Sequence, residues 1–136
     1  MAALLLDTCA VIWLGKAEWV EPSALAQVEA ALHDGVASIS AITTWELGIL
    51  VAKGRLALTR STHAWFETFL AAKRFSLVDL PTQVLVAASE LPGSPPNDPA
   101  DRIIIATARA RNLAIVTRDR RILDYGAAGH VQTVRC

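Results

Sequence analysis

Four acidic side chains in this 136-residue sequence stand next to the expected ends of strands and helices. Asp7 directly follows an apolar run, and Asp119 follows another such run with two residues between. Glu46 and Asp101 fall early in expected apolar helices. Converging carboxylates repel one another, and removing them from water costs free energy unless a cation balances them. The pattern therefore indicates a metal site built from oxygen ligands.

Oxygen ligands favour Mg²⁺ or Mn²⁺ over zinc, because hard divalent cations prefer carboxylate and water oxygens. The three histidines and two cysteines do not show the spacing of a zinc site. Magnesium held by few carboxylates keeps several waters, and one of these can become the nucleophile of a hydrolysis. The chemistry predicted for the four acids is therefore metal-dependent hydrolysis.

Each acid also has a purely structural interpretation. Asp7 can cap the helix that follows it, and Asp98 and Asp101 can both serve a helix N-terminus. Asp119 can belong to a polar turn at residues 117–120, and Glu46 can be an exposed helix acid. Taken singly, these interpretations are at least as good as the functional one. Taken together, they require four coincidences at one edge of a sheet.

The elements that must position these acids alternate between strands and helices. Short apolar runs without polar alternation predict buried strands, and apolar residues at helical spacing between capping and stop residues predict helices. The expected strands cover residues 2–6, 36–39, 75–80, 113–116 and 131–134. The expected helices cover residues 8–14, 21–35, 40–53, 62–73, 81–91 and 98–111.

This order predicts one α/β domain over residues 1–136, with three layers. A central parallel sheet of about five strands is covered by helices on both faces. In such sheets, ligands bind beyond the carboxyl ends of the strands, where the strand order reverses. A loop rich in proline and glycine, residues 91–96, leads the chain to Asp98. The site is therefore expected at the carboxyl edge of the sheet.

Composition supports a folded domain and leaves the partner open. Apolar residues make up 53% of the chain and charged residues 19%, which is ample for a core and excludes disorder. The formal net charge is zero, but residues 102–136 carry +5 and residues 1–101 carry −5. A cationic C-terminal third suits a polyanionic ligand, and a solvated arginine face is an equally good interpretation.

Cysteine usage and hydropathy predict a cytoplasmic location. Two cysteines cannot form a disulfide framework; Cys9 is expected to be a small buried hydrophobe, and Cys136 incidental. The N-terminus lacks the basic region of a signal peptide, and no apolar stretch reaches the roughly 18 residues of a membrane span. The mean hydropathy of +0.37 predicts apolar surface outside the core, which is typical of an interface.

Four segments, in order along almost the whole chain, resemble a known family: residues 5–14, 40–56, 98–108 and 114–122. Their sequences begin LLDTCAVIWL, SAITTWEL, DPADR and AIVTRDRRI. On these residues the chain resembles the PIN-domain ribonucleases of the VapC type, the toxins of bacterial and archaeal toxin–antitoxin pairs. The resemblance implies a PIN fold, an RNA substrate, Mg²⁺ or Mn²⁺, a homodimer, and an antitoxin whose peptide segment covers the site.

The resemblance also implies roles for individual residues. The family's catalytic, metal-binding acids fall on Asp7, Glu46, Asp101 and Asp119. Supporting roles are implied at Thr8, Thr117 and Asp98. Relatives often carry a histidine where this chain has Pro96, so no histidine role is expected at the rim.

Four arginines lie close to the acids in sequence and could hold the flanking phosphates of RNA, which would add affinity without sequence information. They are Arg102, Arg118, Arg120 and Arg121. The alternative is a solubilising face, or ion pairs with Asp98 and Asp124.

Three other functions fit part of the pattern. A phosphoacceptor receiver domain would need an acidic pair before the first helix and a lysine after the last strand, and both are missing. A phosphatase with a covalent aspartate would need a second aspartate where Cys9 stands. A catalytically silent PIN-like module that binds RNA or protein remains the main alternative, although such a module would have no need for four intact acids.

Overall fold

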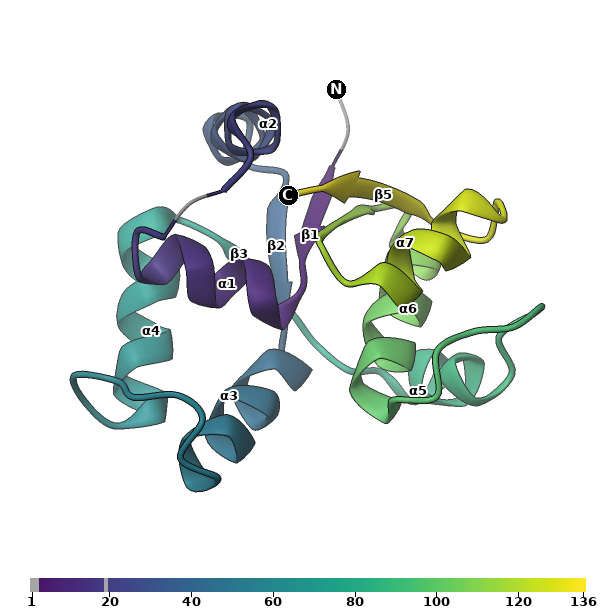
Figure 1. Ribbon diagram of the computed structural model, residues 1–136. Helices are drawn as coiled ribbons and strands as arrows, with labels where there is room; N and C mark the ends of the chain where they lie inside the picture. The colour runs from purple at the N-terminus through teal and green to yellow at the C-terminus, as the bar shows by residue number, and fades with distance from the viewer. Residues whose placement is uncertain (1–2, 19) are drawn as a thin grey trace.

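The computed structural model describes residues 3–18 and 20–136 (Figure 1). Within these residues the middle layer is a parallel sheet of five strands. The strands are β1 (Leu4–Leu6), β2 (Ala37–Ser40), β3 (Ser76–Val78), β4 (Ala114–Thr117) and β5 (Gln132–Arg135). The helices in this part of the chain are α1 (Thr8–Gly15), α2 (Pro22–His33), α3 (Ile42–Ala52), α4 (Thr62–Lys73), α5 (Thr82–Ser89), α6 (Pro99–Arg111) and α7 (Arg120–Ala127).

Strand β1 lies at the centre of the sheet, in the order β3-β2-β1-β4-β5. Leu6 pairs with Ile39 of β2 on one side and with Val116 of β4 on the other, and both pairings are parallel. The chain runs outward from β1 through β2 to β3, then returns to β4 and runs outward to β5. The strand order therefore reverses between β1 and β4. The predicted parallel sheet is confirmed.

The two faces of the sheet carry separate halves of the core (Figure 1). Leu4 and Leu6 pack with residues of α1, α2 and α4 on one face. Leu5 points the opposite way, as strand geometry requires, and packs with Ile104, Ile105 and other residues of α6 and α7. Because both faces are covered, every residue of β1 is buried, which explains its unbroken apolar sequence.

Helix α3 stands beyond the carboxyl end of β2, below the sheet in Figure 1. Its Leu47 packs into the core on the α1 face, while Ile42 contacts the core on the α6 face. Helix α6 begins with Pro99 and ends at Asn112, whose positive φ of 54° closes the helix in a left-handed conformation. The expected helices at 62–73 and 98–111 agree with α4 and α6 within one residue.

Several expectations differ from the structure. Helix α7 occupies residues for which no helix was predicted, and Asp119 caps this helix instead of belonging to a polar turn. Ser40 accepts a hydrogen bond from the Ile42 amide at 3.2 Å, but the residue at the N-cap of α3 is Ala41. Residue 2 of the expected first strand lies outside the described residues.

The expectation that Cys9 is buried was wrong, because Cys9 is exposed. Cys136 is buried with the residues of the apolar core. Among residues 3–18 and 20–136, no helix is both long and apolar enough to cross a membrane.

Candidate metal centre

Asp7 lies directly after β1, where the centre of the sheet meets the first turn of α1. It is buried, with 4% of its surface exposed. Its Oδ1 accepts a hydrogen bond from the Ala10 amide at 2.8 Å, which caps α1, and its Oδ2 accepts the hydroxyl hydrogen of Thr117. The expected capping role is therefore real, and it also holds the carboxylate in one orientation at the sheet edge.

Thr117 ends β4 beside Asp7 and connects it to Asp119. A threonine hydroxyl has one hydrogen, and here that hydrogen goes to Asp7, so the oxygen is free to accept. It accepts from the Asp119 amide at 3.0 Å. Asp119 in turn caps α7, accepting from the amides of Arg121 at 2.8 Å and Ile122 at 3.2 Å. One buried hydroxyl therefore orients two of the predicted acids.

A second threonine pair orients Glu46. Thr8, on the first turn of α1, donates its hydroxyl hydrogen to Glu46 Oε1. The hydroxyl oxygens of Thr8 and Thr43 lie 3.2 Å apart. Because Thr8 has already used its only hydrogen, Thr43 must be the donor to Thr8. Thr43 is fully buried and lies three residues before Glu46, on the same side of α3.

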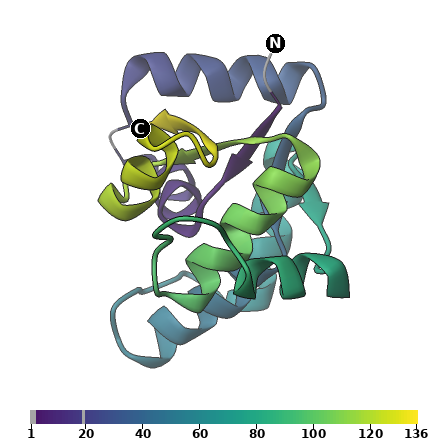
Figure 2. The same ribbon diagram turned by 90° about the vertical axis from the view of Figure 1, so that its right-hand side faces the viewer.

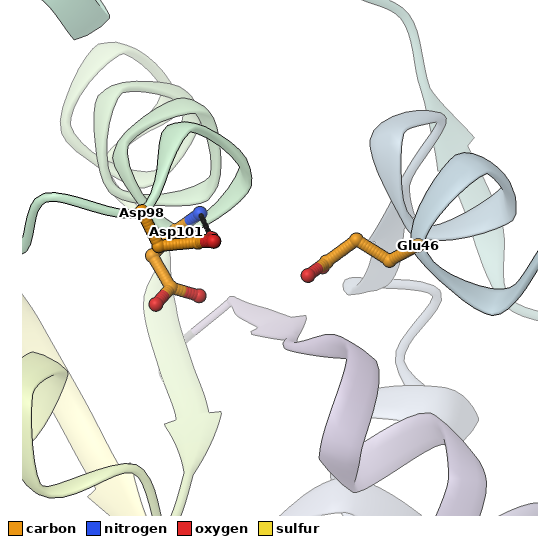
Figure 3. Close-up of side chains that lie close together, drawn as sticks. All are labelled: Glu46, Asp98 and Asp101. Carbon is orange, nitrogen blue, oxygen red and sulfur yellow. Dashed lines mark hydrogen bonds between the residues drawn. The ribbon is translucent and has the colours of Figure 1, made fainter. Parts of the chain in front are cut away.

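Glu46 reaches from α3 toward the start of α6, where Asp98 and Asp101 stand (Figure 3). One carboxylate oxygen from each of these three residues lies within 4.8 Å of the other two. Asp98 also caps α6, its Oδ2 accepting from the Asp101 amide at 2.9 Å. Asp98, expected only to support the site, is thus brought as close to Glu46 as Asp101 is.

The electrostatics of the described residues connect all four predicted acids. Burial, aided by the charges of Asp119 and Glu46, raises the pKa of Asp7 to about 6 against the lowering effect of the Thr117 hydrogen bond. Burial and the charges of Asp98, Asp119, Glu46 and Asp7 raise the pKa of Asp101 to about 7. Burial also raises the pKa of Glu46. Carboxylates whose charge is penalised in this way are sites that a cation would stabilise.

The donor set therefore fits a divalent cation that prefers oxygen. The ligands offered are carboxylates on α3 and α6 and at the ends of β1 and β4, with threonine hydroxyls behind two of them. Although the Cys9 side chain reaches the surface, partial desolvation together with the surrounding carboxylates raises the pKa of its thiol to about 12. A thiol that stays protonated is a poor metal ligand, because the thiolate is the binding form. This environment favours hard cations.

Two of the four arginines are engaged with the protein itself. Arg102 donates to the carbonyls of Ala88 at 2.9 Å, Ser89 at 3.2 Å and Pro96 at 3.3 Å. These bonds join the end of α5 to the loop before α6, which favours a structural role over phosphate contact. Arg118 places its guanidinium carbon 3.4 Å from the centre of the Trp13 ring.

The other two arginines, Arg120 and Arg121, begin α7 and are exposed. Sequence reasoning did not single out Thr43 or Trp13. Thr43 could have been found, because a hydroxyl three residues before Glu46 shares its helix face. The contact of Trp13 with Arg118 joins α1 to the turn after β4 and has no local sequence pattern.

The model of the PIN domain family matches residues 4–128 of the chain. Ribonuclease VapC22 of Mycobacterium tuberculosis is 32% identical over 127 residues, which cover 92% of this chain and 93% of the relative. The structure of VapBC2 from Rickettsia felis, bound to a DNA fragment from its promoter, superposes with a TM-score of 0.69 at 18% identity, covering 97% of each chain. FitAcB from Neisseria gonorrhoeae gives a TM-score of 0.57 at 26% identity, covering 96% of this chain and 95% of the other.

Proposed function

The chain belongs to the PIN-domain family, and from that premise we propose that it is a metal-dependent endoribonuclease, the toxin of a toxin–antitoxin pair. The observation that carries the proposal is the group of carboxylates formed by Glu46, Asp98 and Asp101. The charges of Asp7, Glu46 and Asp119 also help to raise the pKa of Asp101, which supports a site shared by all four predicted acids. The similarity to a ribonuclease over most of both chains supports RNA as the substrate.

The four acids, with Asp98 beside them, are the residues that would hold Mg²⁺ or Mn²⁺. The bound cation would supply water activation, in-line orientation of the phosphate and neutralisation of charge on the leaving oxygen. Asp7 and Glu46 are held for this role by the hydroxyls of Thr117 and Thr8. Fixed partners of this kind orient metal ligands before the metal binds.

Phosphates that flank the cleaved bond would meet Arg120 and Arg121. Both side chains are exposed at the start of α7, and Asp119 precedes them directly. Arg118 has its guanidinium over the Trp13 ring, which favours a structural role for this residue over phosphate contact. Phosphate contacts by Arg120 and Arg121 would add affinity with little sequence preference.

Two exposed apolar surfaces support the proposal that the chain binds partner proteins. Trp45, adjacent to Glu46, is 56% exposed, and it lines a pocket of about 420 Å³ between α3 and α4 with Gly48 and Ile49. An antitoxin segment seated there would bind to α3, the helix that also carries Glu46. Leu85 and Val86 of α5 are also exposed, and they supply a second apolar surface for a homodimer. A solved structure similar to this chain is a toxin–antitoxin complex from Klebsiella pneumoniae, which supports the antitoxin partner.

The proposal is tested by cleavage of a mixed RNA pool with purified protein free of any partner, in EDTA, Mg²⁺ or Mn²⁺. Asp7→Asn and Asp101→Asn are compared with Glu29→Gln, an exposed acid on α2 that serves as the control. We expect metal-dependent cutting that both site variants lose, while they remain folded, and that the control retains. Binding of RNA without cutting under any metal would favour the silent module instead.

A further inference from the structure

A second pocket, which is polar, adjoins the metal centre on the side away from α3. It has a volume of about 580 Å³ and opens between α7 and the loop that joins α5 to α6. Figure 2 shows this loop, in green, facing the viewer. The polar residues that line it are Ser94, Asn97, Arg121, Asp124 and His130.

The walls of this loop–α7 pocket are direct neighbours of the metal-site acids. Asn97, on the loop wall, immediately precedes Asp98. Arg121, on the α7 wall, donates its amide hydrogen to Asp119 at 2.8 Å. An extended strand whose phosphate lies at the acids would therefore have its next nucleotide at the mouth of this pocket.

The loop wall is held in place although it has no regular secondary structure. Tyr125 of α7 donates its phenolic hydrogen to the Pro92 carbonyl at 2.5 Å. The His130 ring stacks on Tyr125 with centroids 4.6 Å apart, and it packs so closely on Gly93 that an added Cβ would lie 2.5 Å from Nε2. Gly93 also has a φ of +69°, which favours glycine. The pocket is thus preformed, as small-ligand sites usually are.

We propose that the loop–α7 pocket receives one unstacked nucleotide of the RNA next to the cleaved phosphodiester, and so determines base preference. The inference rests on the proposed nuclease function. The volume of the pocket falls within the roughly 300–1,000 Å³ typical of small-ligand sites. Unpaired RNA bases are recognised by hydrogen bonds to their edges. The pocket offers the groups for this: the Arg121 and Ser94 donors, the Asp124 acceptor, and the Asn97 amide, which both donates and accepts.

An RNA base fits this lining better than a protein segment does. The pocket mixes a cation, an amide, a hydroxyl and a carboxylate, whereas the α3–α4 pocket is lined mainly by apolar groups such as Trp45 and Ile49. A peptide anchor would favour the apolar pocket, since interface cores are depleted of charge.

The test uses short single-stranded RNAs that the wild-type protein cuts at one bond, with each flanking nucleotide replaced in turn by an abasic one. Asn97→Ala and Asp124→Ala are compared with Gln27→Ala and Asp34→Ala, matched exposed residues on and after α2. We expect the pocket variants to raise KM about tenfold and to flatten base preference at one flanking position, because each removes hydrogen bonds to a base. On the RNA that is abasic at that position, wild type and pocket variants should have equal KM.

Three results would overturn the proposed subsite. In the first, both pocket variants keep the wild-type KM and base preference; in the second, the variants raise KM equally on every abasic RNA. In the third, the variants cleave RNA normally but are inhibited less strongly by a partner protein. All three presuppose that the wild-type protein cuts RNA. If it cuts none, the proposed function fails first, so the two failures are distinguishable.

Discussion

Thr117 donates its hydroxyl hydrogen to Oδ2 of Asp7, a residue 110 positions earlier in the chain. The same oxygen accepts the Asp119 amide. Burial chiefly, together with repulsion from Asp119, raises the pKa of Asp7. The hydroxyl holds both at the point where the strand order of the sheet reverses, and a cation would there meet carboxylates already in position.

Replacing Thr117 with valine should weaken metal binding and cleavage by about 10- to 100-fold, since partners of metal ligands typically contribute this much. Unfolding free energy should fall by roughly 1–3 kcal/mol, because Asp7 loses a buried hydrogen bond. Thr117→Ser should restore most of the cleavage. Thr107→Val is the control: this buried hydroxyl bonds to the Ile103 carbonyl within α6, 2.8 Å away. Urea unfolding and Mn²⁺-dependent kinetics measure both effects, and equal losses of cleavage in the two valine variants would contradict the positioning role.

Asp101→Asn should abolish cleavage and stabilise the metal-free protein at the same time. The substitution removes a charge that burial and neighbouring carboxylates penalise, so the melting temperature in EDTA at about pH 8 should rise. Cleavage in Mg²⁺ should fall by at least about 100-fold, because a ligand is lost. Asp34→Asn, on the exposed end of α2, should change neither quantity. A lower melting temperature in the Asp101 variant would show that its charge is favourable without metal.

The stability of the metal-free protein should fall as pH rises from about 4 to about 7. The pKa values of Asp7 and Asp101 are raised from 3.8 to about 6 and about 7 in the folded state. Across this window the folded protein holds protons that the unfolded chain has released, so raising the pH removes stability. Urea unfolding in EDTA measures the slope of the unfolding free energy against pH. Saturating Mn²⁺ should reverse the sign of this slope, because the cation stabilises the charged carboxylates. If the slope is unchanged in Asp101→Asn, Asp101 does not contribute to the pH dependence of stability.

Arg102→Lys should loosen the loop before α6 without unfolding the protein. Lysine keeps the charge but cannot reach the three carbonyls that the guanidinium fork contacts. We expect amide hydrogens of residues 90–98 to exchange faster and metal affinity to fall several-fold, because Asp98 and Asp101 follow this loop. Arg111→Lys, at the exposed end of α6, is the matched control. Unchanged exchange in that segment would mean that Tyr125 and His130 suffice to hold it.

Sequence reasoning predicted the parallel sheet and the edge of the sheet at which the acids were expected, because buried strands and helix caps can be predicted from short stretches of sequence. It missed α7, although Asp119 precedes Ile122 and Tyr125 at helical spacing, because the residues between Asp119 and the last strand were assigned to no element.

Other features could not be predicted from local patterns. The three carbonyls that Arg102 contacts lie 6 to 14 residues away, two at the end of α5 and one on the following loop, which Tyr125 and His130 hold in place. The exposure of Cys9 depends on how α1 turns away from the sheet. The approach of Asp98 to Glu46 depends on the packing of α3 against α6, elements more than 40 residues apart.

The central position of β1 also bears on when the enzyme can become active during synthesis. Leu4 pairs with Ala37 on one side but with Ala114 on the other, so β1 cannot complete its pairing until β4 has been synthesised. A nascent chain that ends at α6 already contains Asp7, Glu46 and Asp101, yet it lacks the strand that places Thr117 beside Asp7. Contacts so distant in sequence form late in folding. A ribosome making this protein is therefore not exposed to a finished nuclease until β4 and Thr117 have been synthesised.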